Sequence, residues 1–338
     1  MLLHPFYRRG GSCLRHWPTA RSRLTNPRIV GVQYSSTRTP PFPIVDTCPS
    51  PICACRETPR ELDIDQKLPL NNTIARYTEQ VLISTGKEDW TSRIEDEEDN
   101  ALARGLKSLL SRGGRYTDPS FNVAITNSSF PPTTSSPTQN ASAFTFPSFK
   151  YIPTIPNDPQ SIESFLKAFL LPEHAPHGTL PSQDTSKSAR SNTSQSDFKD
   201  VVSVKDIVVL ICGHGGRDQR CGILGPLLRD EFLTQLPQQD AKIQAGPPEA
   251  KESVTSPNDI SARVGLISHI GGHKFAGNVI IYTPPSMGHH PLAGTGIWYG
   301  RIEPQHVEGL VKETILGGRV IKEKFRGGIS RTEGMLNL

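Results

Sequence analysis

The sequence of 338 residues predicts an α/β fold, because short β-branched apolar runs alternate with longer amphipathic segments. This order is clearest from residue 201 onward. Strands are expected at 207–211, 264–268, 278–282 and 297–301, and helices at 222–236 and 304–316. A strand, a helix, a strand, two adjacent strands and a helix are compatible with a thioredoxin-like α/β sandwich, which we place at 200–325.

A smaller α/β region is expected at 45–175. A short helix running into a strand is predicted over 72–85, with a helix at 95–110, a strand at 121–126 and a helix at 158–171. A degenerate thioredoxin-like fold is one candidate for this region, although no internal repeat is visible in the sequence.

Three polar stretches interrupt the expected folded regions. They are a low-complexity insertion at 127–148, a linker at 176–199 and a polar insertion at 237–260. Each has too little apolar surface to offset the entropy cost of ordering, so all three are predicted to be disordered.

The N-terminus has the composition of a mitochondrial presequence. Its first 45 residues contain no Asp or Glu, and their seven arginines are Arg8, Arg9, Arg15, Arg21, Arg23, Arg28 and Arg38. An Arg-rich, acid-free segment with apolar residues for one helical face is typical of such targeting peptides. We therefore expect residues 1–40 to be a disordered presequence read by the mitochondrial import machinery, with delivery to the matrix or the intermembrane space. A disordered basic tail is the alternative.

Composition also excludes two classes of function. The net charge is only +4, its positive excess is concentrated at the N-terminus, and basic side chains do not interleave with aromatic ones. Nucleic-acid binding is therefore not expected. No apolar run is long enough to cross a bilayer, so no membrane span is predicted.

The C-terminal half holds two pairs of potential metal ligands. Cys212 and Cys221 enclose the run Gly-His-Gly-Gly-Arg-Asp-Gln-Arg, and His269 and His273 enclose Ile-Gly-Gly. Both pairs follow expected strands on glycine-rich loops. Two thiolates and two imidazoles can complete a site for zinc or for an iron–sulfur cluster. Cysteines buried as apolar residues and structural histidines are the alternatives without a metal.

Neighbouring residues suit this chemistry. Arg220 and the start of the expected helix should lower the pKa of Cys221. The loop glycines would let backbone amides face bridging sulfides, and the loop's charged residues would brace it; these residues are Gly213, Gly215, Gly216, Arg217, Asp218 and Arg220. Gly271 and Gly272 argue against a helix between the histidines.

Three segments carry a family resemblance. Cys-Gly-His-Gly-Gly-Arg-Asp-Gln-Arg-Cys-Gly, Ser-His-Ile-Gly-Gly-His-Lys-Phe-Ala-Gly-Asn and Gly-Ile-Trp-Tyr-Gly-Arg-Ile-Glu-Pro resemble the sucrase/ferredoxin-like family. The resemblance implies a thioredoxin-like ferredoxin domain that holds a [2Fe–2S] cluster through Cys212, Cys221, His269 and His273. His214 matches a loop position of the pattern and not a ligand position.

The function implied by the resemblance is electron transfer or thiol redox quality control, with a redox partner that the sequence does not identify. Histidine ligands raise the reduction potential relative to an all-thiolate cluster and can couple electron transfer to protonation. The runner-up is a structural zinc-binding interaction module. A glycosidase is not predicted, because no paired-carboxylate constellation is evident.

A second cysteine cluster lies near the start of the expected folded sequence. Cys48, Cys53 and Cys55 have no evident fourth partner for a metal. We expect a structural or thiol-redox role for them. A metal-free thiol oxidoreductase would depend on this cluster, because the C-terminal half has no Cys-x-x-Cys motif.

Overall fold

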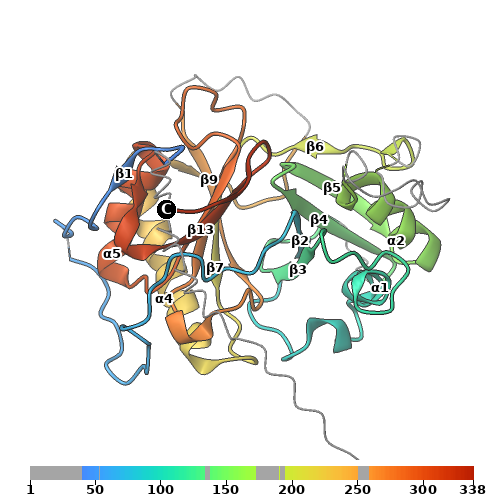
Figure 1. Ribbon diagram of the computed structural model, residues 1–338, viewed down its shortest axis with the longest axis horizontal. Coiled ribbons are helices and arrows are strands. Elements are labelled where there is room, and N and C mark those ends of the chain that lie inside the picture. Colours follow the sequence, from blue (N-terminus) through green and yellow to red (C-terminus); the bar gives the residue numbers. More distant parts are fainter. Residues whose placement is uncertain (1–39, 53, 134–137, 173–189, 191–194, 250–258) are drawn as a thin grey trace, which may run out of the picture. The chain divides into compact units, whose positions relative to one another are not determined.

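The structure is a computed structural model that describes residues 40–338 except 53, 134–137, 173–189, 191–194 and 250–258 (Figure 1). The expected presequence, apart from Pro40, and most of the expected linker lie outside the described residues. Within the described part of the chain, no helix has the length and apolar character needed to cross a membrane.

The C-terminal half contains the six predicted elements in the predicted order. They are β7 (Ile207–Cys212), α4 (Gln219–Gln238), β9 (Ser261–Ile267), β10 (Val279–Thr283), β11 (Thr295–Tyr299) and α5 (Pro304–Leu310), which continues as η5 (Val311–Leu316). The strand order is β9-β7-β10-β11, with β7 parallel to β9 and antiparallel to β10. This mixed sheet with helices on one side is compatible with the expected thioredoxin-like fold.

The N-terminal half repeats this topology. Its elements are β2 (Glu79–Ser84), α1 (Ala101–Leu110), β3 (Val123–Ser128), β4 (Asn140–Phe146), β5 (Lys150–Pro156) and α2 (Pro159–Phe165), which continues as η2 (Leu166–Leu170). The strand order is β3-β2-β4-β5, and β2 is again parallel to the next strand in sequence and antiparallel to the one after it. The repeat that the sequence did not reveal is therefore present in the order of elements.

Two predictions for the N-terminal half were wrong. Most of the described residues in the 127–148 stretch are ordered, because this stretch includes β4. Phe144 and Phe146 of β4 alternate with polar residues, and both aromatic side chains are buried in the core. Between Pro40 and β2, the described residues form no helix. Asn72 has a φ of 63°, and Thr73 donates backbone hydrogen bonds to Leu70 and Arg326 at 3.2 Å, so this segment turns instead.

Other predicted boundaries shift. The expected helix at 95–110 begins only at Ala101, where the Asn100 side chain accepts a hydrogen bond from the Ala103 N–H at 3.2 Å; a 3₁₀ turn, η1 (Ile94–Asp96), precedes it. The expected insertion at 237–260 is partly ordered, because α4 runs to Gln238 and β8 (Lys242–Ile243) pairs with β9.

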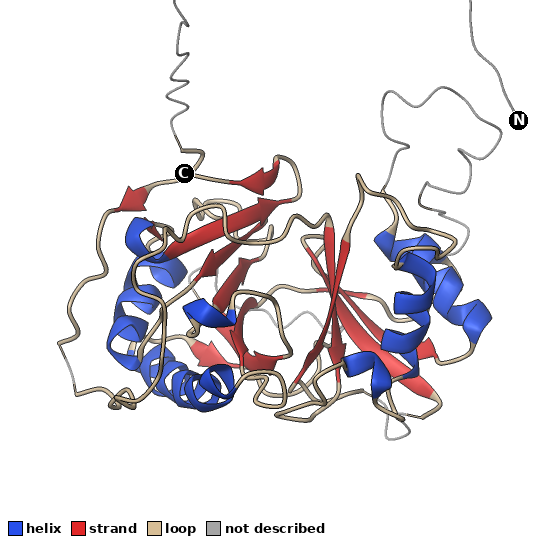
Figure 2. Cartoon of the chain, turned by 60° about the horizontal axis from the view of Figure 1, so that its bottom comes forward, coloured by secondary structure: helices blue, strands red, loops and turns tan. Residues whose placement is uncertain are grey.

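The two halves share one sheet and a common core. β3 meets β9 at the single pair Ser128–Ile267. Helices α4 and α5 cover the outer side of one half, and α1 and α2 cover the outer side of the other (Figures 1 and 2). The helix-free faces pack on each other, and Phe146 stacks on Tyr282 with ring centroids 4.1 Å apart. In β7, Val208 and Leu210 face this inner core, as the two-residue period of a strand requires.

Short strands complete the sheets. β13 (Phe325–Ser330) pairs with β11, and β14 (Gly334–Leu336) pairs with β13. The sheet thus continues beyond the expected end at 325. β6 (Val202–Ser203) pairs with β5, while β1 (Ile44–Val45) and β12 (Val320–Ile321) form a separate two-stranded sheet.

Candidate metal centre

The two cysteines of the predicted ligand set lie together in the interior. β7 ends at Cys212, and Cys221 lies in the first turn of α4 rather than just before the helix, as we expected. Both side chains are buried, and each cysteine shifts the pKa of the other.

The pKa values of the two cysteines are shifted in opposite directions. The hydrogen bond from Cys221 lowers the pKa of Cys212 against the effect of burial, and hydrogen bonds from His269 and from the backbone N–H of His214 lower it further. The same thiol–thiol hydrogen bond and burial raise the pKa of Cys221. The Arg220 charge does act to lower the pKa of Cys221, as expected, but the neighbouring Cys212 and burial outweigh it.

The histidines sit on the loop after β9. His269 is half-buried and is hydrogen-bonded to Cys212, while His273 is exposed. Gly271 and Gly272, with φ of 86° and 76°, turn the backbone between them as predicted, and a 3₁₀ turn, η4 (His273–Phe275), follows. The two imidazole centroids are 5.4 Å apart.

All four predicted ligands are thus brought to one place, as two neighbouring pairs. Cys212 joins the pairs through its contacts with Cys221 and His269. The described residues contain no group of three or more His, Cys, Asp or Glu side chains arranged around a single metal ion.

His214 lies in the cysteine loop but is fully occupied by structural contacts. Its Nδ1 accepts a hydrogen bond from the His269 backbone N–H at 2.9 Å. Its Nε2 lies 3.0 Å from the carbonyl oxygen of Trp90 and 2.9 Å from that of Thr91. Because Nδ1 accepts, Nε2 carries the proton and donates to these carbonyls. His214 therefore has no nitrogen left for a metal.

Glycines let the cysteine loop pack tightly between α4 and the N-terminal half. A Cβ on Gly216 would collide with the carbonyl oxygen of Trp90, and a Cβ on Gly225 would lie 2.5 Å from the Cα of Gly213. The Gly216 N–H donates to the Asp89 carboxylate at 3.0 Å, so this amide does not face the thiols, contrary to expectation. The amide that does so belongs to His214.

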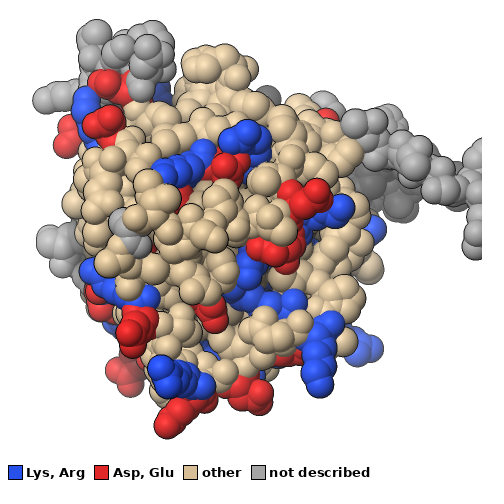
Figure 3. Space-filling model, turned by 90° about the vertical axis from the view of Figure 1, so that its left-hand side faces the viewer, with Lys and Arg blue, Asp and Glu red and all other residues tan. Residues whose placement is uncertain are grey.

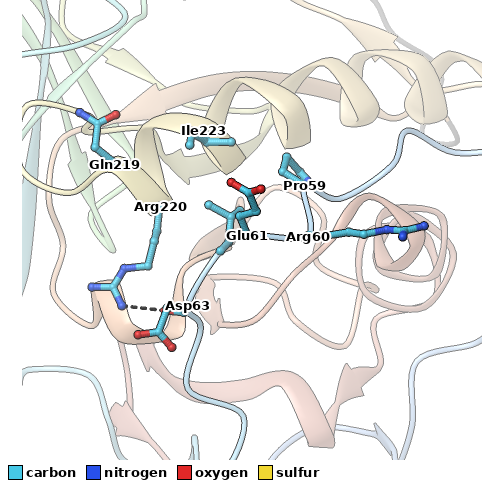
Figure 4. A pocket seen from close by; sticks show the side chains of 8 residues that line it. Pro59, Arg60, Glu61, Asp63, Gln219, Arg220 and Ile223 are labelled. Atoms are coloured by element: carbon cyan, nitrogen blue, oxygen red, sulfur yellow. Dashed lines mark hydrogen bonds between the residues drawn. The ribbon is translucent and has the colours of Figure 1, made fainter.

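The charged residues of the loop brace it as predicted. The Asp218 carboxylate accepts from the Arg220 guanidinium at 2.8 Å and from the Arg220 backbone N–H, which caps α4. Arg217 donates to the Ser92 hydroxyl at 3.2 Å. Arg220 also donates to the carbonyl oxygen of Asp63 at 2.8 Å, across an open pocket between the 59–63 segment and the start of α4 (Figure 4).

Sequence reasoning missed two residues beneath the histidine loop. Arg326, on β13, donates from Nη1 to the carbonyl oxygen of Gly271 at 3.2 Å and to Oδ1 of Asn278 at 2.6 Å. Asn278 in turn donates to the carbonyl oxygen of Gly272 at 3.0 Å. An arginine directly after Phe325, at the start of the Phe-Arg-Gly-Gly-Ile-Ser strand, was the available signal.

Within the N-terminal cysteine cluster, Cys48 contacts α5. Cys48 is half-buried, its Sγ lies 3.6 Å from the carbonyl oxygen of His306, and burial raises the pKa of its thiol to about 11. A protonated thiol is a poor nucleophile, which favours a structural role for Cys48. Cys53 lies outside the described residues.

The outer face of the C-terminal half carries charges of both signs. On the face shown in Figure 3, Lys and Arg are interspersed with Asp and Glu. Arg56 pairs with the buried Glu231 at 2.8 Å, and Lys322 lies 3.5 Å from Asp46. This face therefore lacks the continuous basic surface that nucleic-acid binding requires.

Comparison with known proteins gives a family match over most of the chain. A sequence profile described as sucrase/ferredoxin-like matches residues 70–327, which include both ligand pairs. The chain belongs to the sucrase/ferredoxin-like family.

Curated relatives in the sucrase/ferredoxin-like family match most of the chain. "Altered inheritance of mitochondria protein 32" of Meyerozyma guilliermondii is 30% identical over 304 residues, which cover 85% of this chain and 95% of the relative. The protein of the same name from Debaryomyces hansenii is 30% identical over 300 residues, covering 84% and 96%. That of Clavispora lusitaniae is 38% identical over 180 residues, covering 50% and 56%. No solved structure gives a significant match.

Proposed function

We propose that this protein is a mitochondrial one-electron carrier that holds a [2Fe–2S] cluster through Cys212, Cys221, His269 and His273. The observation that carries the proposal is the convergence of these four side chains. Cys212 contacts both Cys221 and His269, and the two imidazoles are 5.4 Å apart. Thiol redox quality control is the wider role that such an electron carrier could serve.

The donor set fits this cluster chemically. Thiolates and imidazoles are the ligands of mixed cysteine–histidine [2Fe–2S] centres, in which one iron takes the sulfur ligands and the other the nitrogen ligands. In this protein, the two cysteines would hold one iron and the two neighbouring histidines would hold the other. A single zinc ion would need four ligands around one point, and the described residues contain no such group. When bound, the cluster would accept and release one electron.

The two ligand pairs differ in their exposure to solvent: the cysteines are buried, and the histidines lie nearer the surface. Cys212 and Cys221 are buried under the cysteine loop and α4, which excludes water from the thiolates. His269 is half-buried and His273 is exposed. Electron exchange with a partner protein is therefore expected at the histidines, where the path to the surface is shortest.

The proposed location rests on the N-terminal sequence and on the relatives' names. The first 45 residues are acid-free and Arg-rich, and the relatives are named for mitochondrial inheritance. Fusion of residues 1–45 to a fluorescent reporter should direct it to mitochondria. Protease protection after outer-membrane rupture would distinguish matrix from intermembrane space, and a cytosolic reporter would contradict the proposal.

Metal analysis of the purified full chain tests the cluster. Anaerobic protein should contain iron and acid-labile sulfide in equal amounts, absorb visible light and give a paramagnetic signal after dithionite reduction. Cys212→Ser, Cys221→Ser, His269→Ala and His273→Ala should each lose most of the iron. His289→Ala, which changes an exposed histidine outside the site, is the matched control and should retain it. Colourless protein with stoichiometric zinc would overturn the proposal in favour of the structural zinc module.

A further inference from the structure

Arg326 is a buried cation with an unusual set of partners. Only 1% of its surface is exposed, although it carries a guanidinium group. Nε donates to the Thr73 hydroxyl at 3.0 Å, and Nη2 donates to the Thr73 carbonyl oxygen at 2.8 Å. Nη1 donates to Gly271 and Asn278. All these acceptors are neutral, and among the described residues no Asp or Glu forms an ion pair with Arg326.

Burial of an uncompensated charge costs several kcal/mol, so a buried arginine normally has an anionic partner. The other buried arginine of the C-terminal half follows this rule, because Arg263 lies 2.6 Å from the Asp206 carboxylate. For Arg326 the nearby groups that can carry negative charge are the sulfur atoms of Cys212 and Cys221, the two proposed sulfur ligands. Burial lowers the pKa of Arg326 to about 10, and negative charge on these two sulfurs acts in the opposite direction.

Contacts of Arg326 also fix the histidine loop. A Cβ on Gly272 would collide with the guanidinium, so the loop lies directly on this group. Together, Arg326 and Asn278 bind the carbonyl oxygens of the two glycines between the histidines. The guanidinium carbon lies 5.5 Å from the centroid of the Phe275 ring, which closes the opposite side of the loop. The charge therefore has a defined position beneath the site.

We propose that Arg326 is the internal counter-charge of the metal centre, and that it raises the reduction potential by stabilising the reduced state. This inference rests on the proposed function. Reduction adds one electron, taken from a one-electron donor, and leaves the site more negative by one charge, while no covalent bond of the protein breaks. A fixed buried cation favours the more negative state, and the low dielectric of the interior strengthens this effect.

Redox titration of the loaded full-length protein tests the assignment. The variants are Arg326→Gln, which removes the charge, and Arg326→Lys, which retains it with fewer hydrogen bonds. Midpoint potentials are measured with dithionite and dye mediators and followed by visible circular dichroism. Arg326→Gln should lower the potential by about 59 mV or more, a tenfold change in the equilibrium constant of a one-electron couple. Arg326→Lys should remain closer to the unmodified protein than to Arg326→Gln.

Arg301→Gln is the matched control. Arg301 also lies over the Phe275 ring, at 5.1 Å, but Asp65 lies 3.6 Å from its guanidinium and provides a counter-charge. Its removal should shift the potential much less. Equal shifts for Arg301→Gln and Arg326→Gln, or an unchanged potential in Arg326→Gln, would overturn the assignment.

Cluster loss is also informative. If Arg326→Gln takes up no iron while Arg326→Lys does so with a near-native potential, the requirement for a positive charge is supported. If both variants lose the cluster, Arg326 has a packing role only and the counter-charge assignment fails. Failure of the unmodified protein to bind iron and sulfide would instead reject the proposed function, so the two failures are distinguishable.

Discussion

The backbone N–H of His269 donates to Nδ1 of His214 at 2.9 Å, and this hydrogen bond ties the histidine loop to the cysteine loop. The other nitrogen of the same imidazole binds carbonyl oxygens of Trp90 and Thr91 in the N-terminal half. The buried side chain of His214 thus links the cysteine loop and the histidine loop to the N-terminal half. His214 thus positions the proposed ligand His269, although it is outside the predicted ligand set.

Removal of this link should weaken the site without removing a ligand. In His214→Ala, two carbonyl oxygens and one N–H at least partly shielded from water lose their partner, so the free energy of unfolding should fall by about 1–3 kcal/mol. Urea denaturation of the metal-free protein measures this loss. The loaded variant should bind the normal amount of iron but lose its colour faster. Failure to bind any iron under conditions where the fold persists would identify His214 as a ligand.

The contact between α4 and the cysteine loop should not tolerate even one methyl group. In Gly225→Ala, the Cβ would lie 2.5 Å from the Cα of Gly213 and 2.8 Å from the carbonyl oxygen of Cys212. We expect a loss of about 1–3 kcal/mol from this overpacking, measured by urea denaturation. Gly246→Ala is the control, because a Cβ there meets nothing within 4 Å. Equal stabilities for the two variants would contradict the close approach.

Stability should fall in mildly acidic solution because of His306. Burial lowers the pKa of this histidine from 6.5 to about 4, with a smaller contribution from Lys324. Its Nδ1 accepts from the Glu303 N–H at 3.0 Å at the start of α5. Because the unfolded chain binds a proton at a higher pH than the folded chain, stability is fully present above pH 6.5 and is lost as the pH falls toward 4.

The size of this effect should be about 1–2 kcal/mol, after allowance for the partial exposure of His306. Denaturation of the metal-free protein at several pH values measures it and avoids acid loss of the cluster. His306→Gln keeps an acceptor for the Glu303 N–H but cannot titrate, so its stability should change less over this range. Parallel curves for the two proteins would rule out His306 as the source.

Exchange of one imidazole for a thiolate should lower the reduction potential. In His269→Cys, the added negative charge disfavours reduction, and a fall on the order of 100 mV is expected from the difference between mixed-ligand and all-cysteine clusters. Redox titration followed by the paramagnetic signal measures it. His289→Cys adds a cysteine at an exposed position outside the site and should leave the potential unchanged. An unchanged potential in loaded His269→Cys would argue against His269 as a ligand.

Prediction succeeded where the local pattern was strong. The buried β-branched run at 207–211 predicted β7, and the alternation of segments after it predicted the sequence of helices and strands in the C-terminal half. Prediction failed for β4, because its buried Phe144 and Phe146 lie among Ser, Thr and Asn, and this polar composition led us to expect disorder. The repeat of the fold in the N-terminal half was missed because the two halves resemble each other in topology and not in sequence. β7 ends at the proposed ligand Cys212, whereas the corresponding strand β2 ends at Ser84.

The sequence by itself determined which four side chains are candidate ligands, because cysteine and histidine pairs on glycine-rich loops after strands form a local pattern. Only the tertiary structure decided that these pairs meet, and that Arg326 and His214 support them. Those contacts join residues far apart in the chain: 55 positions separate His269 from His214 and Gly271 from Arg326. Hydrogen bonds and charges act across space once the chain has folded, so no local spacing could reveal them.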